Sequence, residues 1–101
     1  MDEDYAFAPP PFDSVAALER LRRSLRELRP LQERAGPPLR YELSGQTVLE
    51  LLPGSSLIEA RLARQPARTP QWQPAVRLQD SAALRDFIER VRRQLAVWTD
   101  D

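Results

Sequence analysis

Between residues 39 and 62, apolar and charged side chains alternate in three short runs, and this alternation limits the fold more than any other feature of the chain. A period of two is typical of strands that bury one face and expose the other. Ser44-Gly45-Gln46 and Pro53-Gly54-Ser55-Ser56 separate the runs, and both segments favour turns. The sequence therefore predicts an antiparallel meander with strands over 39–43, 47–51 and 58–62.

The register at the first turn can be derived from the positions of the apolar residues. A two-residue loop at Ser44-Gly45 would put Leu49 and Leu51 on the charged face of the preceding strand. A three-residue loop at 44–46 places all the apolar residues on one face, which burial of that face requires. The expected pairs are Leu43 with Thr47, Tyr41 with Leu49, and Leu39 with Leu51.

The second turn is expected to be a four-residue loop over 53–56. The pairs that keep the apolar residues on the same face are Leu51 with Ile58 and Leu49 with Ala60. On the outer face this register puts Glu50 opposite Glu59, with Arg40 on the other side of Glu50. Paired carboxylates do acid–base chemistry when one pKa is raised, but an exposed pair beside an arginine is expected to stay ionised.

Two segments with apolar residues at three- and four-residue spacing predict amphipathic helices on either side of the meander. The first is expected over 15–29, after Asp13 or Ser14 as N-cap and before Pro30, which cannot continue a helix. The second is expected over 82–98, after Asp80 or Ser81. The two apolar stripes are Val15, Leu18, Leu21, Leu25 and Leu28, and Leu84, Phe87, Ile88, Val91, Leu95 and Trp98.

Proline and glycine mark the connections between these elements. Residues 30–38 are predicted to be a linker and 66–74 a loop, while 75–78 would add a fourth strand at the edge of the sheet. The predicted fold class is α+β: a two-layer domain of helix, antiparallel three- or four-stranded meander, and helix over residues 14–101. Because one sheet face has to cover both stripes, and the second stripe ends in Trp98, we expect a homodimer.

Residues 1–13 are predicted to form an arm ahead of this domain. The arm carries four carboxylates, no arginine, and three consecutive prolines that favour polyproline II. It also holds three aromatic residues, although a tail that only solvates the protein would be poor in them. We therefore expect contacts to a partner, or to the chain's own domain, from Tyr5, Phe7, Phe12 and Trp98.

The chain contains 15 arginines and neither lysine, histidine nor cysteine. Imidazole bases, thiolates and amine nucleophiles are therefore excluded, and so are the preferred ligands of zinc. Glycine-rich phosphate-binding loops and the strained serine turn of hydrolases are also missing. We predict that the chain is not an enzyme, with no catalytic residue, no metal site and no cofactor.

The arginines lie between residues 14 and 99, where 15 of them face nine carboxylates, so a basic body has acidic ends. Rows of arginine suit phosphates, and basic residues beside an aromatic are typical of single-stranded nucleic-acid binding. The outer sheet face, with mixed charge and no aromatic in the expected register, is unlike a sheet that reads RNA. The candidate contacts are Arg22, Arg26 and Arg29 on the first helix, and Arg64, Arg68 and Trp72 in the loop.

Two functions remain open at this point. The favoured one is a non-catalytic interaction module that binds a protein partner, or itself, through its helix stripes and aromatic arm. The alternative is a single-stranded nucleic-acid-binding protein, whose affinity would fall steeply with salt. The acidic start, and the lack of an apolar run of about 20 residues, predict a cytoplasmic protein with no membrane contact.

Overall fold

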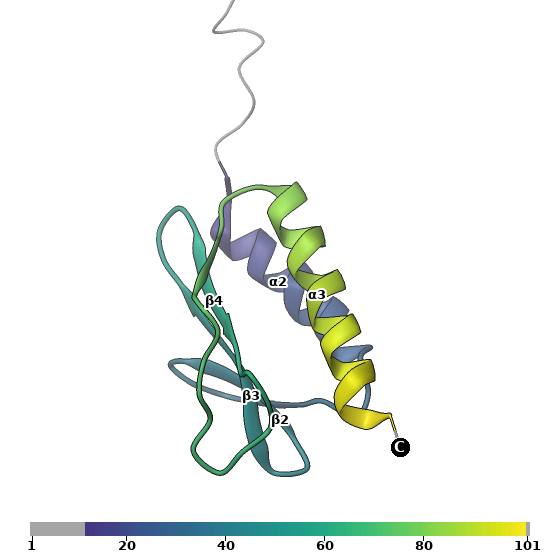
Figure 1. The fold of residues 1–101 in the computed structure, drawn as a ribbon. Coiled ribbons are helices and arrows are strands. Elements are labelled where there is room, and N and C mark those ends of the chain that lie inside the picture. The colour runs from purple at the N-terminus through teal and green to yellow at the C-terminus, as the bar shows by residue number, and fades with distance from the viewer. Residues whose placement is uncertain (1–11, 101) are drawn as a thin grey trace, which may run out of the picture.

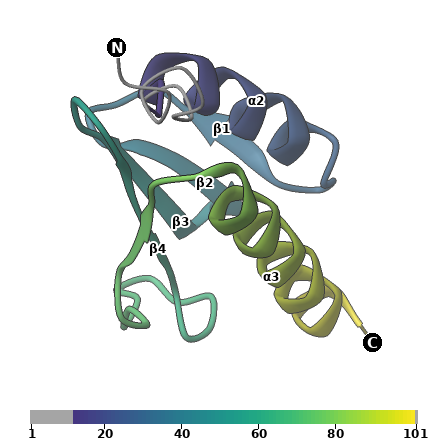
Figure 2. The ribbon, with the colours of Figure 1, turned by 90° about the horizontal axis from the view of Figure 1, so that it is seen from above.

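The computed structural model describes residues 12–100 of the chain. In this part the helices are α2 (Ser14–Arg26) and α3 (Ser81–Thr99), and the strands are β1 (Gln32–Arg34), β2 (Leu39–Leu43), β3 (Gln46–Pro53), β4 (Ile58–Leu62) and β5 (Val76–Leu78). The strands form one antiparallel sheet in the order β1-β2-β3-β4-β5. Both helices lie on the same side of the sheet (Figure 1, Figure 2). The predicted α+β class and the order helix, meander, helix are confirmed.

Helix α2 begins at an aspartate cap and ends earlier than predicted. The Asp13 carboxylate accepts hydrogen bonds from the backbone N–H groups of Val15 and Ala16 at 3.0 and 3.2 Å, which satisfies two donors at the helix start. Val15 was expected in the apolar stripe but is 73% exposed. The buried stripe runs through Ala17, Leu21 and Leu25 at four-residue spacing, and Val15 falls outside it.

Helix α3 follows its prediction closely. The Asp80 side chain accepts a hydrogen bond from the backbone N–H of Ala83 at 2.8 Å and so caps the helix. Leu84, Phe87, Val91 and Leu95 are buried at three- and four-residue spacing. The stripe is therefore long enough to cover the sheet along most of the helix.

The first turn of the meander combines a shorter loop with an extra residue in the strand. Ser44 and Gly45 have φ of 53° and 83°, the pair of positive φ angles that a two-residue hairpin turn requires. Leu43 therefore lies opposite Gln46, and not opposite Thr47 as predicted. A bulge opposite Tyr41 and Glu42 then restores the expected pairs with Leu49 and Leu51. Because the bulge inserts Val48, both Val48 and Leu49 are buried.

The second turn is displaced from its prediction by one residue at each end. Gly54 donates a backbone hydrogen bond to Leu57 at 2.7 Å, so the loop spans 54–57 and Pro53 pairs with Ile58. Leu51 consequently lies opposite Ala60, and Leu49 opposite Leu62. The pairing of β3 with β4 is shifted by two residues relative to the prediction, and a shift of two leaves every side chain on its predicted face. On the outer face, however, Glu50 lies opposite Arg61, so the expected Glu50–Glu59 pair does not form.

Strand β1 was not predicted, because residues 30–38 were interpreted as a linker. Gln32, Glu33 and Arg34 contain no apolar residue whose alternation could reveal a strand. The chain turns back at Gly36, where a Cβ atom would collide with the carbonyl oxygen of Pro38. This close approach, which only glycine permits, lays β1 against β2 with Glu33 opposite Tyr41.

The inner face of the sheet and the two helices form one hydrophobic core in the described residues. Tyr41, Leu51 and Ile58 from the sheet are fully buried, as are Leu21 and Leu25 from α2. Trp98 is partly buried and packs against the same core. One chain thus covers both helix stripes, while the opposite face of the sheet is left without a helix over it (Figure 2).

Candidate functional site

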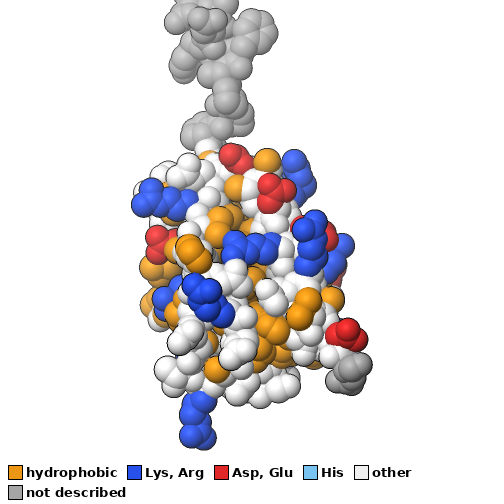
Figure 3. Space-filling view, in the orientation of Figure 1, with side chains coloured by type: hydrophobic (Ala, Val, Ile, Leu, Met, Phe, Trp, Pro, Cys, Tyr) orange, Lys and Arg blue, Asp and Glu red, His pale blue; other side chains and the backbone are white. Residues whose placement is uncertain are grey.

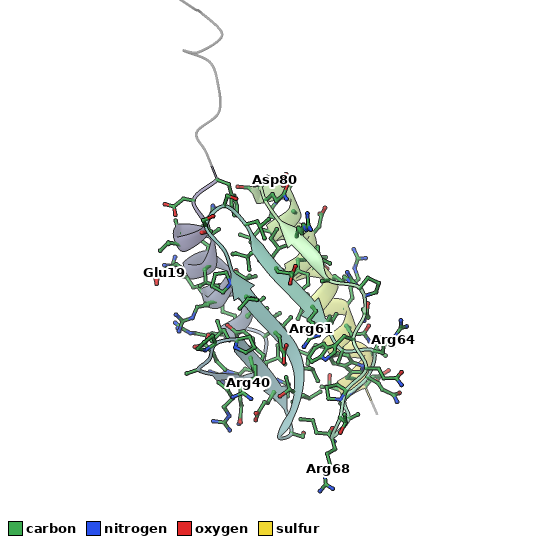
Figure 4. All side chains as sticks on the ribbon, turned by 90° about the vertical axis from the view of Figure 1, so that its left-hand side faces the viewer. Glu19, Arg40, Arg61, Arg64, Arg68 and Asp80 are labelled. Carbon is green, nitrogen blue, oxygen red and sulfur yellow. The ribbon has the colours of Figure 1, made fainter. Side chains whose placement is uncertain are left out.

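The uncovered face of the sheet carries charges of both signs. We call it the open face and define it by side chains that alternate with the buried ones: Arg34, Arg40, Glu42, Glu50, Leu52, Glu59, Arg61 and Arg77. Figure 4 views the molecule from this side, with Arg40 and Arg61 on strands in front of the helices. Four arginines and three glutamates nearly balance, so the open face is mixed in charge and not basic.

Two ion pairs order part of the open face. Arg61 donates from Nε and Nη2 to Oε1 of Glu50 at 2.9 and 2.7 Å, and Arg34 Nε lies 3.2 Å from Oε1 of Glu42. Exposed ion pairs of this kind contribute about 0–1 kcal/mol to stability. Their main effect is therefore to fix the positions of these side chains.

Trp72 lies beside this face and not in a separate loop site. The guanidinium carbon of Arg61 is 4.3 Å from the centre of the Trp72 ring, a distance that gives a cation–π interaction. Trp72 is held in place because it bridges to Ala63 in the sheet. The outer-face positions of the strands themselves hold no aromatic, but Trp72 from the following loop lies against Arg61 at the margin of the face. Arg61 covers one side of the ring, which leaves less of it for stacking on a base.

Three charged groups on the open face, Arg40, Glu59 and Arg77, make no ion pair with any of residues 12–100. The Nε atom of Arg40 is buried and has no hydrogen-bond acceptor. A buried donor without a partner costs about 1–3 kcal/mol. Glu59, on the other side of β3, is exposed and is not in an ion pair within the described residues. Arg77 on β5 is exposed and lies opposite Glu59, so the face presents two arginines and one carboxylate without an ion pair in this part of the chain.

A hollow with an apolar floor lies beside Glu59 on the open face. Its volume is about 300 Å³, and its lining includes Pro38, Leu52 and Ala75 together with Glu50, Glu59 and Arg61. Leu52 is 50% exposed, which is unusual for a leucine in the middle of a sheet. The volume is at the lower limit of small-molecule sites, so a side chain from another protein fits it better than a cofactor.

The arginine row predicted on the first helix is partly used inside the fold. Arg22 donates to both carboxylate oxygens of Glu33 at 2.9 and 3.1 Å, and Arg26 lies 3.6 Å from Oε1 of the same carboxylate. The Tyr41 hydroxyl donates to Glu33 at 2.6 Å. Arg29 follows the end of α2 and is exposed. The structure thus brings Arg22 and Arg26 together around Glu33.

The same contacts shift the pKa values in this cluster. The hydrogen bond from Arg22 lowers the pKa of Glu33 to about 2, although burial opposes the change. Burial, followed by the hydrogen bond to Glu33, raises the pKa of Tyr41 above its usual range. Hydrogen bonding to Glu33 also raises the pKa of Arg22. All three groups therefore keep their charge states at neutral pH, as a structural cluster does and a proton-transfer site does not.

Arg64 and Arg68 lie in the loop that joins β4 to β5. The loop is closed by backbone hydrogen bonds from Arg64 to Gln71 at 2.8 Å and from Gln73 to Leu62 at 2.9 Å. Arg68 extends away from the body of the molecule (Figure 4). Both arginines are exposed, and neither has an ion-pair partner in the described part of the chain.

The predicted arm contacts can be placed only in part. Tyr5 and Phe7 lie outside the described residues. Phe12 is partly buried and packs against the core, as Trp98 does at the other end of the chain. The Ser14 hydroxyl donates to the carbonyl oxygen of Gly54 at 2.8 Å, which ties the root of the arm to the β3–β4 turn.

The sequence did not reveal the arrangement of charges on the open face, because that arrangement depends on register. Only the observed pairing puts Arg61, in place of Glu59, beside Glu50. Residues 12–100 hold no cluster of three or more carboxylates arranged to bind a metal, and no helix among them is long and apolar enough to cross a membrane. Neither a protein-family model, a curated protein nor a solved structure matches this chain.

Proposed function

We propose that this chain is a non-catalytic interaction module that binds protein through its open face, and that the partner the face fits best is a second copy of the chain. The helix stripes, which were expected to bind the partner, are covered by the chain's own sheet. Arginine and tryptophan are enriched among the residues that dominate protein interfaces; the open face offers arginines, and Trp72 lies at its margin against Arg61. The function proposed for this face is therefore the assembly of a homodimer, without a chemical reaction.

The observation that carries this proposal is that Arg40 and Glu59, which have opposite charges and no ion pair among residues 12–100, lie on the same face. Arg40 on β2 is level with Glu50, and Glu59 on β4 is level with Leu52. Midway between them is the segment of β3 from Glu50 to Leu52. A two-fold axis that lies in the interface and crosses β3 there brings Arg40 of each copy to Glu59 of the other.

Charge supports a protein partner over a nucleic acid at this face. Three carboxylates on the open face would repel phosphates, whereas they complement the arginines of a second copy. In such a dimer the half-exposed Leu52 side chains would lie close to the axis, where interfaces are most apolar. The guanidinium of Arg40 would gain a charged partner.

Sedimentation equilibrium of the full chain tests the proposal. Leu52→Glu adds two like charges near the axis and should make the protein monomeric at concentrations at which the unchanged chain is a dimer. Val97→Glu is the matched control, since Val97 is 67% exposed on α3, away from the open face. A wild-type chain that stays monomeric, or a dimer that survives Leu52→Glu, would show that the open face is not the interface.

Single-stranded nucleic-acid binding is a second candidate, supported by the exposed Arg64 and Arg68 beside Trp72. On the side of the molecule in Figure 3 the basic side chains are separated by apolar and polar ones and form no continuous stripe. Fluorescence anisotropy with a labelled single-stranded oligonucleotide, at low and moderate salt, tests it. The double variant Arg64→Ala, Arg68→Ala should lose binding. Arg85 is an exposed arginine on α3, and the control variant Arg85→Ala should keep binding. Equal loss in both variants would mean non-specific charge attraction.

A further inference from the structure

Strand β5 is an edge of the sheet, and a hollow runs between it and helix α3. No strand of residues 12–100 pairs with the outer side of β5, so part of its backbone lacks a hydrogen-bonding neighbour. The hollow has a volume of about 220 Å³ and is lined by Val76 of β5 and by Ala83, Asp86, Phe87 and Arg90 of α3. An edge strand beside a helix is a surface on which an extended peptide adds as a further strand and places alternate side chains against the helix.

The first residues of the chain have the sequence that such a site requires. Tyr5 and Phe7 alternate with Ala6 and Ala8, so an extended segment would put both aromatic rings on one side and only methyl groups on the other. Val76 and Leu78 are the residues of β5 that face the helices. With Phe7 level with Leu78 and Tyr5 level with Val76, the two rings would fill the hollow against α3.

The length of the arm is sufficient for it to reach this edge of its own domain. Pro53, Ile58 and Leu78 lie level on three adjacent strands, so a sixth strand beyond β5 would be about 15 Å from Pro53 at the usual strand spacing. The arm is rooted next to Pro53, through the Ser14 hydrogen bond to Gly54. From Phe7 to Ser14 a polyproline-type segment spans about 22 Å. Figure 1 shows that the chain enters α2 at the end of the molecule where β5 passes into α3.

Charge favours the same placement. In this register the acidic residues Asp2, Glu3 and Asp4 would continue past Val76 along residues 73–75. Arg90 donates a hydrogen bond to Gln73 there, and Arg64 lies at the neck of the adjacent loop, where its backbone bonds to Gln71. The acidic end of the arm would therefore lie near Arg90 and Arg64, which have no carboxylate partner among the described residues.

We propose that residues 4–8 of the arm add to β5 of the same chain as a sixth strand, parallel to β5, with Tyr5 and Phe7 in the hollow between β5 and α3. A short tether gives an effective concentration in the millimolar range, so the chain's own arm outcompetes that of another copy at ordinary protein concentrations. The arm then caps the edge and lies over the arginine loop. This inference concerns a different surface from the open face and does not depend on it.

A spin label tests the placement directly. The chain has no cysteine, so Asp2→Cys carries a nitroxide at one defined site. Amide NMR signals of Ala75 and of the loop around Arg64 should broaden, whereas a label at Val97→Cys should leave them sharp. A second sample mixes two proteins: one is enriched in the NMR-active isotope and has no nitroxide, and the other carries the nitroxide and is not enriched. The signals of the enriched protein should show no broadening in this mixture. Broadening in that mixture would overturn docking in the same chain, and broadening nowhere near β5 would overturn docking altogether.

Hydrogen exchange with altered anchors provides the second test. The double variant Tyr5→Ser, Phe7→Ser removes both rings. It keeps the acidic residues of the arm and changes none of residues 12–100. Exchange of the β5 amides should become at least about tenfold faster if the arm protects them. Ala6→Ser with Ala8→Ser is the matched control and should leave their exchange unchanged. Equal exchange in both variants and in the unchanged chain would refute the proposal, whatever the oligomeric state of the protein.

Discussion

Glu33 is the residue whose removal should alter stability most clearly as a function of pH. It lies in strand β1, with 20% of its side chain exposed, and accepts hydrogen bonds from Arg22 and from the hydroxyl of Tyr41. These contacts hold its pKa at about 2 in the folded protein, against 4.5 for the free group. Glu33→Gln keeps the shape and the ability to accept a hydrogen bond but removes the charge.

The magnitude follows from the two pKa values. Each pH unit between them corresponds to 1.36 kcal/mol, so the ionised carboxylate contributes about 3 kcal/mol to the free energy of unfolding. Because the folded pKa is the lower one, this contribution is complete above about pH 5 and is lost as the pH falls towards about 2. An unchanged chain should therefore lose about 3 kcal/mol from this group on acidification. Glu33→Gln should lack the contribution at every pH.

Urea unfolding followed by tryptophan fluorescence at several pH values between 2 and 7 measures this difference. At pH 7 the Glu33→Gln variant should be less stable by about 3 kcal/mol, and its stability should approach that of the unchanged chain near pH 2. Glu27→Gln, which changes an exposed carboxylate at the end of α2 without an ion pair in the described residues, is the control and should follow the unchanged chain. Two parallel profiles for Glu33→Gln and the unchanged chain would refute the reasoning.

Three further substitutions test the local structure. Gly45→Val forces a branched residue to a φ of 83° and should cost about 1–2 kcal/mol in urea unfolding; no loss would mean that the turn differs. Asp80→Ala removes the cap of α3 and should cost about 1 kcal/mol, seen also as reduced helical circular dichroism. Leu25→Ala, at a fully buried position, should cost about 2–5 kcal/mol, whereas Val97→Ala should change stability by less than about 0.5 kcal/mol.

The parts of the fold that sequence alone predicts are those with a periodic apolar signal. Strands β2 to β4 alternate, and α3 has a continuous stripe from Leu84 to Leu95, so each pattern specifies both the element and its buried face. β5 could be anticipated from Ala75 to Leu78 because the same alternation continues there. β1 could not, since Gln32, Glu33 and Arg34 are polar, and the strand exists because Gly36 lets the chain turn back onto β2.

Register was the weaker part of the prediction, and the candidate site depended on it. Requiring that apolar residues share a face does not distinguish pairings that differ by two. The turn at Gly54 therefore decided between Glu59 and Arg61 as the neighbour of Glu50. Nor could burial alone reveal the bulge at Val48, which needs the positive φ angles of Ser44 and Gly45. The arrangement of charges on the open face thus became visible only with the cross-strand pairs.

The most direct test of the open face as a self-association surface is a charge-swap experiment by sedimentation equilibrium. Arg40→Glu and Glu59→Arg should each weaken the dimer at least about 30-fold, since breaking a buried charge pair costs 2 kcal/mol or more. In an equimolar mixture of the two variants, the heterodimer has one native Arg40–Glu59 pair and one pair with reversed signs, so both contacts join opposite charges. The account predicts that this mixture regains the dimer that each variant alone has lost. A mixture that stays as monomeric as its components, or single variants that dimerise like the unchanged chain, would contradict it.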